Sequence, residues 1–94
     1  MRWLPLFLDL KGRRVVVVGG GTIAERKIDL FIQSGAAIEV VAPQITQRLA
    51  ARAAAGELQH HAREFQPADL DGARLAVAAT DAPLVNRAVA TAAD

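Results

Sequence analysis

The sequence predicts an α/β fold of the doubly wound type, built on a parallel sheet with the expected strand order 3-2-1-4. Four consecutive valines, Val15 to Val18, show no alternation and indicate a strand covered on both faces. Three glycines follow them directly, and an amphipathic helix pattern follows the glycines. Apolar strands and helix patterns then alternate with short connections, which is typical of right-handed strand–helix–strand units.

The boundaries of the expected helices and strands are clearest in the first half of the chain. After the Val15–Val18 strand, a helix is expected from Thr22 to about Gln33, with an apolar stripe of small and large residues on one face. That stripe consists of Ala24, Ile28, Phe31 and Gly35, and Ser34-Gly35 is also expected to end the helix. A second strand, Ile38–Ala42, is expected to end at Pro43, because proline lacks the N–H that continues a sheet.

The second half is expected to complete the alternation. Thr46 has the side chain of a helix cap, and Gly56 is placed to end that helix after about Ala55. The remaining expected segments are a weaker strand at Leu58–Arg63, a loop or single helical turn at Pro67–Gly72, a strand at Leu75–Ala79, and a final helix capped by Asp81 and running toward Ala93. Residues Trp3 to Leu10 are expected to form an extended lead-in against the sheet.

Composition limits the classes of protein to consider. Residues 1–94 suffice for one small domain, and no linker or repeat divides them. A net charge of +1 gives no bulk attraction to nucleic acid or to an anionic membrane. The absence of cysteine excludes a disulfide scaffold, a thiolate nucleophile and a cysteine metal site. No apolar run approaches the length of a membrane span, so we expect a soluble protein.

The glycine segment carries the main functional signal. Gly19, Gly21 and Ala24 match the Gly-x-Gly-x-x-Gly/Ala spacing of a Rossmann-like dinucleotide-binding turn. The first glycine permits a tight exit from the strand, and the second lets backbone approach a pyrophosphate. The small Ala24 lets the helix lie against the strand, while the helix start offers N–H groups to phosphate oxygens.

The expected ligand site lies beyond the carboxyl ends of the strands. The candidate cofactor-binding residues are therefore Gly19, Gly20, Gly21, Thr22, Ile23, Pro43, Gln44, Thr80 and Asp81. Thr22 can donate its hydroxyl to a phosphate, or it can simply be solvated at the helix start. Asp81 can bind a ribose or nicotinamide, can cap the final helix, or can do both.

One element of an NAD site is missing from the sequence. The end of the second strand reads Val41-Ala42-Pro43-Gln44, with no acid for the ribose hydroxyls, and Arg48 is the nearest arginine. The residues alone leave NAD and NADP open, with Gln44 and backbone groups as ribose contacts.

Other chemistry has little support in the sequence. The adjacent His60 and His61 should point to opposite faces of a strand, so we expect surface histidines and no metal site. Lys27 is expected in solvent, with the cleft as the alternative.

Beyond these patterns, the sequence resembles the N-terminal domain of the siroheme synthase family, which acts as precorrin-2 dehydrogenase and sirohydrochlorin ferrochelatase. The resemblance spans essentially all of the chain. The residues that carry it are Pro5-Leu6-Phe7, Asp9-Leu10, Val17-Val18-Gly19-Gly20-Gly21, Ala24-Glu25-Arg26-Lys27, Gly35-Ala36, Val40-Val41-Ala42-Pro43, Ala78-Ala79-Thr80-Asp81 and Val85-Asn86.

The resemblance implies NAD-dependent oxidation of precorrin-2 to sirohydrochlorin, with ferrous iron insertion in some members. It also implies a homodimer, a cytoplasmic location and cofactor contacts at Gly19–Ile23, Pro43-Gln44 and Thr80-Asp81. The family's proposed catalytic aspartate and dimerisation segment would follow Asp94. We therefore expect a domain that is incomplete on its C-terminal side and inactive alone. Its catalytic residues are unknown. The alternatives are a non-catalytic NAD(H)-sensing module and an interaction domain whose glycines serve only packing.

Overall fold

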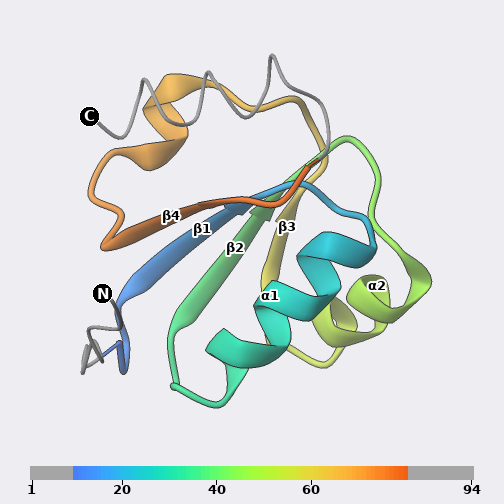
Figure 1. Ribbon diagram of the computed structural model, residues 1–94, viewed down its shortest axis with the longest axis horizontal. Helices are drawn as coiled ribbons and strands as arrows, with labels where there is room; N and C mark the ends of the chain where they lie inside the picture. The colour runs from blue at the N-terminus through green and yellow to red at the C-terminus, as the bar shows by residue number, and fades with distance from the viewer. Residues whose placement is uncertain (1–9, 81–94) are drawn as a thin grey trace, which may run out of the picture.

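The computed structural model describes residues 10–80 and shows a parallel sheet with helices packed on it (Figure 1). The four strands are β1 (Arg14–Val18), β2 (Ala37–Val41), β3 (Gln59–His61) and β4 (Leu75–Ala78), in the order β3-β2-β1-β4. The helices are α1 (Thr22–Ile32), α2 (Gln47–Ala54) and the short 3-10 helix η1 (Pro67–Leu70). The expected fold class and strand order 3-2-1-4 are confirmed.

The observed boundaries lie close to the expected ones. The second strand begins and ends one residue earlier than expected, and the weak third strand shortens to Gln59–His61. The segment expected as a loop or helical turn contains η1. The expected lead-in before Leu10 and the expected helix capped by Asp81 lie outside the described residues.

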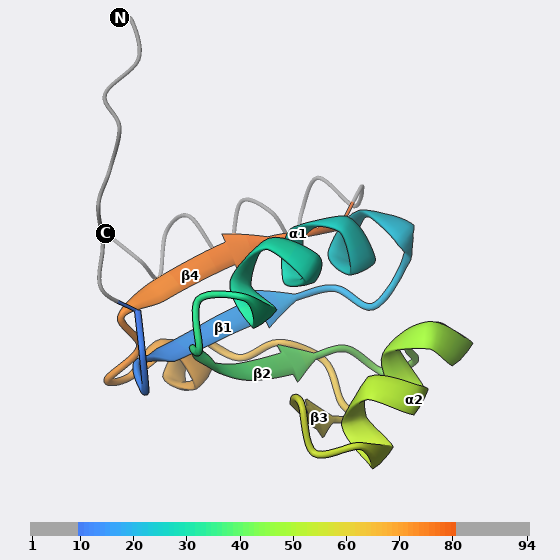
Figure 2. The same ribbon diagram turned by 90° about the horizontal axis from the view of Figure 1, so that it is seen from below.

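The two faces of the sheet are covered differently. Helices α1 and α2 lie on the same face, as the second view shows (Figure 2), while η1 lies over the other. The larger core cluster, on the α1 and α2 face, consists of Val15, Val17, Ala24, Ile28, Ile38, Val40, Ala42, Leu49, Leu58 and Ala79. The smaller cluster, beneath the segment containing η1, is built on Val16, Val18 and Val41. Successive valines of β1 therefore alternate between two cores, which explains why the sequence shows no polar alternation.

The helices follow the expected stripes and caps with one exception. Ala24 and Ile28 are fully buried, and Phe31 packs at the edge of the same cluster. Gly35 is exposed and lies in the turn after the helix with a φ of 76°, so it ends α1 and does not belong to the stripe. Thr46 caps α2 as expected, because its hydroxyl accepts a hydrogen bond of 3.2 Å from the backbone N–H of Leu49.

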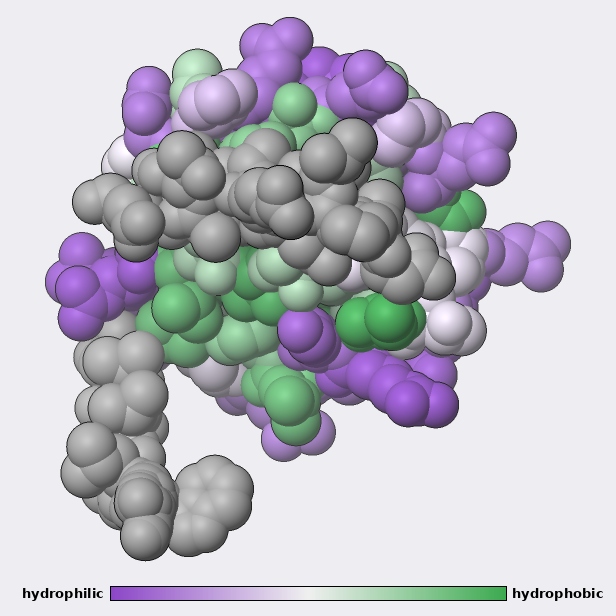
Figure 3. Space-filling model, turned by 45° about the horizontal axis from the view of Figure 1, so that its top comes forward, coloured by the Kyte–Doolittle hydropathy of each residue, from purple (hydrophilic) through white to green (hydrophobic). Residues whose placement is uncertain are grey.

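Strand β4 forms one edge of the described sheet. It pairs with β1 alone, and all of its residues are only half-buried. In the space-filling view, hydrophobic side chains gather near the middle of the visible face and hydrophilic ones lie around its margin (Figure 3). None of the helices within residues 10–80 is long and apolar enough to cross a membrane.

A polar network joins the amino-terminal part of the sheet to the segment around η1. Arg14 donates through Nε to Glu39 at 2.6 Å, across a sequence separation of 25. The same guanidinium donates to the backbone carbonyls of Asp71 and Asp69 at 2.6 and 2.8 Å. On its other side, Glu39 accepts a hydrogen bond of 3.0 Å from His61 of β3. The network therefore ties β1, β2 and β3 to the connection that leads into β4.

The glycine turn after β1 packs tightly against two other connections. A Cβ on Gly19 would lie 2.2 Å from the carbonyl oxygen of Ala79, and one on Gly20 would lie 2.2 Å from that of Gln44. The Gly20 carbonyl also accepts a hydrogen bond of 2.9 Å from the N–H of Thr46. The ends of β1, β2 and β4 therefore converge because no side chain separates them.

Replacing Glu39 with glutamine should weaken the polar network in a pH-dependent way. Arg14, and then His61, hold the pKa of Glu39 below its ordinary value. Since the folded pKa is lowered, the stabilisation is fully present well above the ordinary glutamate pKa of about 4.3 and is lost as pH falls through the folded pKa. We expect the variant to lose about 1–2 kcal/mol of unfolding free energy at neutral pH. Urea denaturation across this range should show the difference shrinking in acid.

Glu57→Gln is the matched control. Glu57 pairs with Arg52 at 2.7 Å at the surface, with 43% of the Glu57 side chain exposed. Exposed pairs of this kind contribute little, so we expect a loss below about 0.5 kcal/mol. Equal losses at the two positions would contradict the role given to the Arg14–Glu39 pair.

Substitution by alanine should destabilise the chain much more at Gly20 than at the neighbouring Gly21. A methyl group on Gly20 would push the Gln44–Ile45 backbone away, and we expect a loss of about 1–3 kcal/mol in stability. A methyl group on Gly21 meets no heavy atom within 4 Å, so we expect a loss below about 1 kcal/mol. Thermal and denaturant unfolding of both variants measure the contrast, and equal stability of the two would refute the packing argument.

Candidate functional site

A cleft of about 640 Å³ lies at the carboxyl ends of the strands. Its walls come from the turn after β1 and from the connections that follow β2, β3 and β4. The residues that line it are Val18, Gly19, Gly20, Gly21, Thr22, Ile23, Val41, Ala42, Pro43, Gln44, Glu64, Phe65, Ala79 and Thr80. This is the end of an open α/β sheet at which ligands are bound in such folds.

The candidate residues from the sequence converge on this cleft. Segments 19–23, 43–44 and Thr80 all line it, although they come from three separate connections. Asp81 lies outside the described residues, so its cap and ligand roles stay predictions. A contact between any of these residues and a cofactor also stays a prediction.

The start of α1 faces the cleft without a side-chain cap. Gly21 is the N-cap residue with φ −94° and ψ −160°, and among residues 10–80 no side chain caps the first turn. The first N–H groups of a helix have no partner within it and carry the positive end of the helix dipole. A Cβ at Gly21 would have no neighbour within 4 Å, so open space lies beside these donors. The geometry fits an anionic group such as a pyrophosphate.

Thr22 and Ile23 complete the first turn at the cleft. Both residues are exposed, and Ile23 keeps 43% of its surface accessible. The position of Thr22 is compatible with either alternative raised from the sequence, phosphate donor or solvated helix residue. Ile23 presents an apolar side chain to the cleft, which a ligand ring could cover.

Sequence reasoning missed the contribution of the connection between β3 and η1. Glu64 and Phe65 both line the cleft. Phe65 packs against the Val16, Val18 and Val41 cluster, which places it on the face of the sheet opposite α1 and α2. The weak periodicity after residue 58 concealed this contact, and the only available signal was that a connection after β3 must emerge at the ligand-binding end.

An ion pair fixes the shape of this connection. The guanidinium of Arg63 forms two hydrogen bonds with the carboxylate of Asp69, one of them 2.8 Å from Nη1 to Oδ2. The same carboxylate accepts a hydrogen bond of 2.7 Å from the N–H of Gln66. Asp69 is 8% exposed, and the Arg63 hydrogen bonds hold its pKa below the ordinary value. The carboxylate is therefore charged near neutral pH and closes the chain around Phe65.

Lys27 takes neither of its two expected positions. Its Nζ donates a hydrogen bond of 3.0 Å to the carbonyl oxygen of Ala78, at the end of β4. Lys27 is half-buried and is not among the described residues that line the cleft. The expectation of a solvated lysine is therefore wrong, because the side chain ties α1 to the edge strand.

The two histidines are also more constrained than expected for surface residues. His60 donates through Nε2 to the carbonyl of Ala42 at 2.8 Å, and His61 donates to Glu39 at 3.0 Å. Both are half-buried. Within residues 10–80, no three His, Cys, Asp or Glu side chains are grouped so that they could hold a metal ion.

The cleft combines an uncapped helix start, apolar walls and a single charged side chain among its described lining residues, Glu64. An elongated ligand with a central anionic group and apolar rings matches this arrangement. Among the described lining residues there is no nucleophile paired with a base and no pair of carboxylates. The site can therefore bind and orient such a ligand, and the reacting group must come from the ligand or from outside the described residues.

Comparisons with known proteins agree with this geometry. Residues 6–94 match the family model described as "Putative NAD(P)-binding". The chain is 48% identical over 94 residues to the siroheme synthase of Photorhabdus laumondii and 50% identical over 94 residues to that of Chromobacterium violaceum. In both cases all of this chain is covered, and it spans 20% of the relative's length.

A solved structure of a related protein is similar to this chain in its fold as well as in its sequence. The protein described as "SirC, precorrin-2 dehydrogenase" matches with a TM-score of 0.89 and 43% sequence identity. The match covers 94% of this chain and 44% of the SirC chain. The resemblance to siroheme synthases drawn from the sequence motifs is confirmed. The chain belongs to the NAD(P)-binding family that this model describes.

Proposed function

We propose that this chain is the NAD-binding part of a precorrin-2 dehydrogenase, an oxidoreductase of siroheme biosynthesis. The observation that carries the proposal is its similarity to SirC, which extends over 94% of the chain at 43% sequence identity. The relatives named siroheme synthase support the same pathway, with tetrapyrroles as substrates. Because the chain spans a fifth of those relatives, the complete reaction is proposed for a protein of their length.

The residues that would hold the cofactor follow from the cleft. The uncapped N–H groups after Gly21 would bind the pyrophosphate, and the missing side chain at Gly21 would let it approach the backbone. Pro43 and Gln44 would contact the adenosine half on the β2 side. Thr80 would contact the nicotinamide half on the β4 side, together with Asp81 as expected from the sequence.

The residues present indicate which part of the reaction the cofactor would carry out and which part the protein would. When bound, NAD would accept a hydride from the tetrapyrrole, which the protein side chains cannot do themselves. The chain's contribution would be to fix the cofactor along the strand ends and to cover its apolar parts with Ile23 and Phe65, which line the cleft from opposite faces of the sheet. Iron insertion, a homodimer and a cytoplasmic location stay predictions of the family resemblance.

A bulky residue at position 21 should weaken cofactor binding strongly without unfolding the chain. Gly21→Val places a side chain in the open space beside the first turn of α1, where the pyrophosphate would lie. We expect NAD+ and NADH affinity to fall by more than about tenfold, equivalent to about 1.4 kcal/mol. Isothermal titration calorimetry measures the affinity, and circular dichroism checks that the fold persists.

Ala50→Val serves as the control, because Ala50 is an exposed residue of α2 that does not line the cleft. It should bind NAD like the unchanged chain. No detectable binding of either cofactor form to the unchanged chain at about millimolar concentration would count against the proposal. Undiminished affinity of Gly21→Val would sink the pyrophosphate assignment.

Activity needs a separate test on a protein with the length of its siroheme synthase relatives. That protein should convert precorrin-2 to sirohydrochlorin only when NAD+ is supplied, as followed by the absorbance of the product. Gly21→Val in the same protein should remove this activity. A protein that binds NAD and leaves precorrin-2 unchanged would instead favour the sensing module considered from the sequence.

A further inference from the structure

The cleft contains an acidic residue, Glu64, at a position other than the one at which the dinucleotide-binding pattern predicts an acid. In dinucleotide-binding folds, an Asp or Glu after the second strand binds the adenosine ribose hydroxyls. Here β2 is followed by Ala42, Pro43 and Gln44, none of which is charged. Glu64, from a different connection, lines the same cleft.

The sheet register brings Glu64 to the β2 end of the cleft. Val41, the last residue of β2, is paired with His61, the last residue of β3. The backbone N–H of Ala42 also donates to the His61 carbonyl at 3.2 Å. The connection after β3 therefore begins level with the end of β2, and Glu64 lies three residues further along it.

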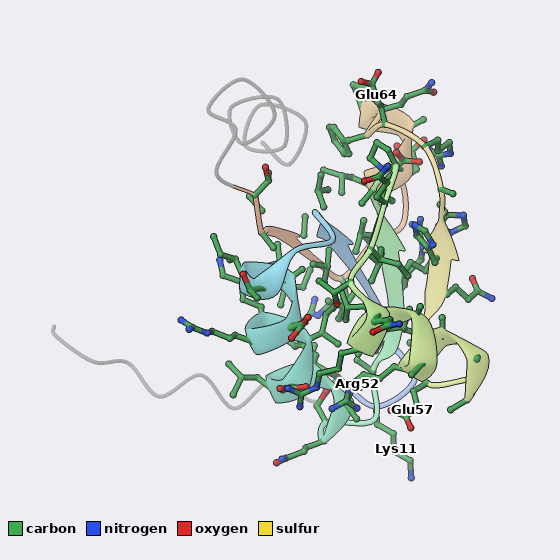
Figure 4. All side chains as sticks on the ribbon, turned by 90° about the vertical axis from the view of Figure 1, so that its right-hand side faces the viewer. Lys11, Arg52, Glu57 and Glu64 are labelled. Atoms are coloured by element: carbon green, nitrogen blue, oxygen red, sulfur yellow. The ribbon has the colours of Figure 1, made fainter. Side chains whose placement is uncertain are left out.

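Both neighbours of Glu64 in the chain are anchored. Arg63 is held by its ion pair with Asp69, and its N–H donates to the His61 carbonyl at 2.9 Å. Phe65 is packed against the valine cluster of β1 and β2. Glu64 is exposed between them, at the end of the molecule opposite Arg52 and Glu57 (Figure 4). Its backbone is thus fixed at the rim of the cleft while its carboxylate can turn toward a ligand.

The charges around the cleft favour a ribose over a ribose phosphate. The Glu64 carboxylate makes no hydrogen bond or ion pair with another described residue. The nearby cation Arg63 is neutralised by Asp69. Arg48, the arginine nearest in sequence to the end of β2, pairs with Asp29 of α1 at 3.2 Å. No described lining residue carries a positive charge that could bind a 2′-phosphate.

We infer that Glu64 selects NAD(H) over NADP(H), by accepting hydrogen bonds from the adenosine ribose hydroxyls and by repelling a phosphate at the 2′ position. The connection after β3 supplies the acid that the end of β2 lacks. The inference rests on the proposed NAD binding, and it names the residue that decides the form of the cofactor.

The test compares NADH and NADPH affinities of the unchanged chain with those of Glu64→Gln and Glu64→Arg, using the fluorescence of the reduced nicotinamide. We expect the unchanged chain to prefer NADH by at least about tenfold. Glu64→Gln should weaken NADH binding by about tenfold and leave NADPH binding the same or stronger. Glu64→Arg should reverse the preference, because a guanidinium binds a phosphate directly.

Glu57→Gln and Glu57→Arg make the same changes of charge far from the cleft and should leave both affinities unchanged. Equal affinity of the unchanged chain for NADH and NADPH, or unaltered NADH affinity in Glu64→Gln, would overturn the inference while the proposed function stands. Failure of the unchanged chain to bind either dinucleotide would instead overturn the proposed function, and the inference with it. Thermal unfolding of each variant verifies that the fold is retained.

Discussion

The architecture depends on a steric constraint at the end of β1. Two consecutive residues, Gly19 and Gly20, have backbone carbonyls of other connections where a side chain would begin. One carbonyl belongs to the residue after β4 and the other to the connection between β2 and α2. The absence of two Cβ atoms lets three connections meet at one point, and the residues that meet there line the cleft. The third glycine, Gly21, leaves its space open toward the cleft. The three adjacent glycines thus serve two purposes, packing and access.

Most of the fold and three of the four connections that line the cleft could be predicted from the sequence, because they depend on local patterns. The buried valine run, the glycine spacing and the Thr46 cap each depend on neighbouring residues, and parallel topology then brings the strand ends together. Three features could not be predicted. The Arg14–Glu39–His61 network, the bond from Lys27 to β4, and the position of Glu64 and Phe65 all depend on side chains distant in sequence. Their partners become apparent only once the register of the strands is known.

The polar network and the ion pair of Asp69 have a common effect on the face opposite α1 and α2. Within residues 10–80, the apolar cluster that holds the segment around η1 on that face is small. Arg14 donates hydrogen bonds to the backbone carbonyls of this segment. Within the segment, the Asp69 carboxylate accepts hydrogen bonds from Arg63 and from the N–H of Gln66. Charged hydrogen bonds thus replace part of the apolar contact that a longer helix would provide. As a result, the side chain of Phe65 has a defined position beside the cleft.

The central place of β1 has a consequence for how the protein is made. Its two neighbours in the sheet are β2, which follows it closely, and β4, which lies near the other end of the described chain. Contacts between distant segments form slowly, because a long loop must close before they are gained. During synthesis from the amino terminus, one edge of β1 therefore stays unpaired until β4 has left the ribosome. The cleft, whose last wall is Ala79 and Thr80, is complete only then. Binding competence thus appears only after β4 has paired with β1, and a ligand that needs the whole cleft would stabilise only chains in which this pairing has formed.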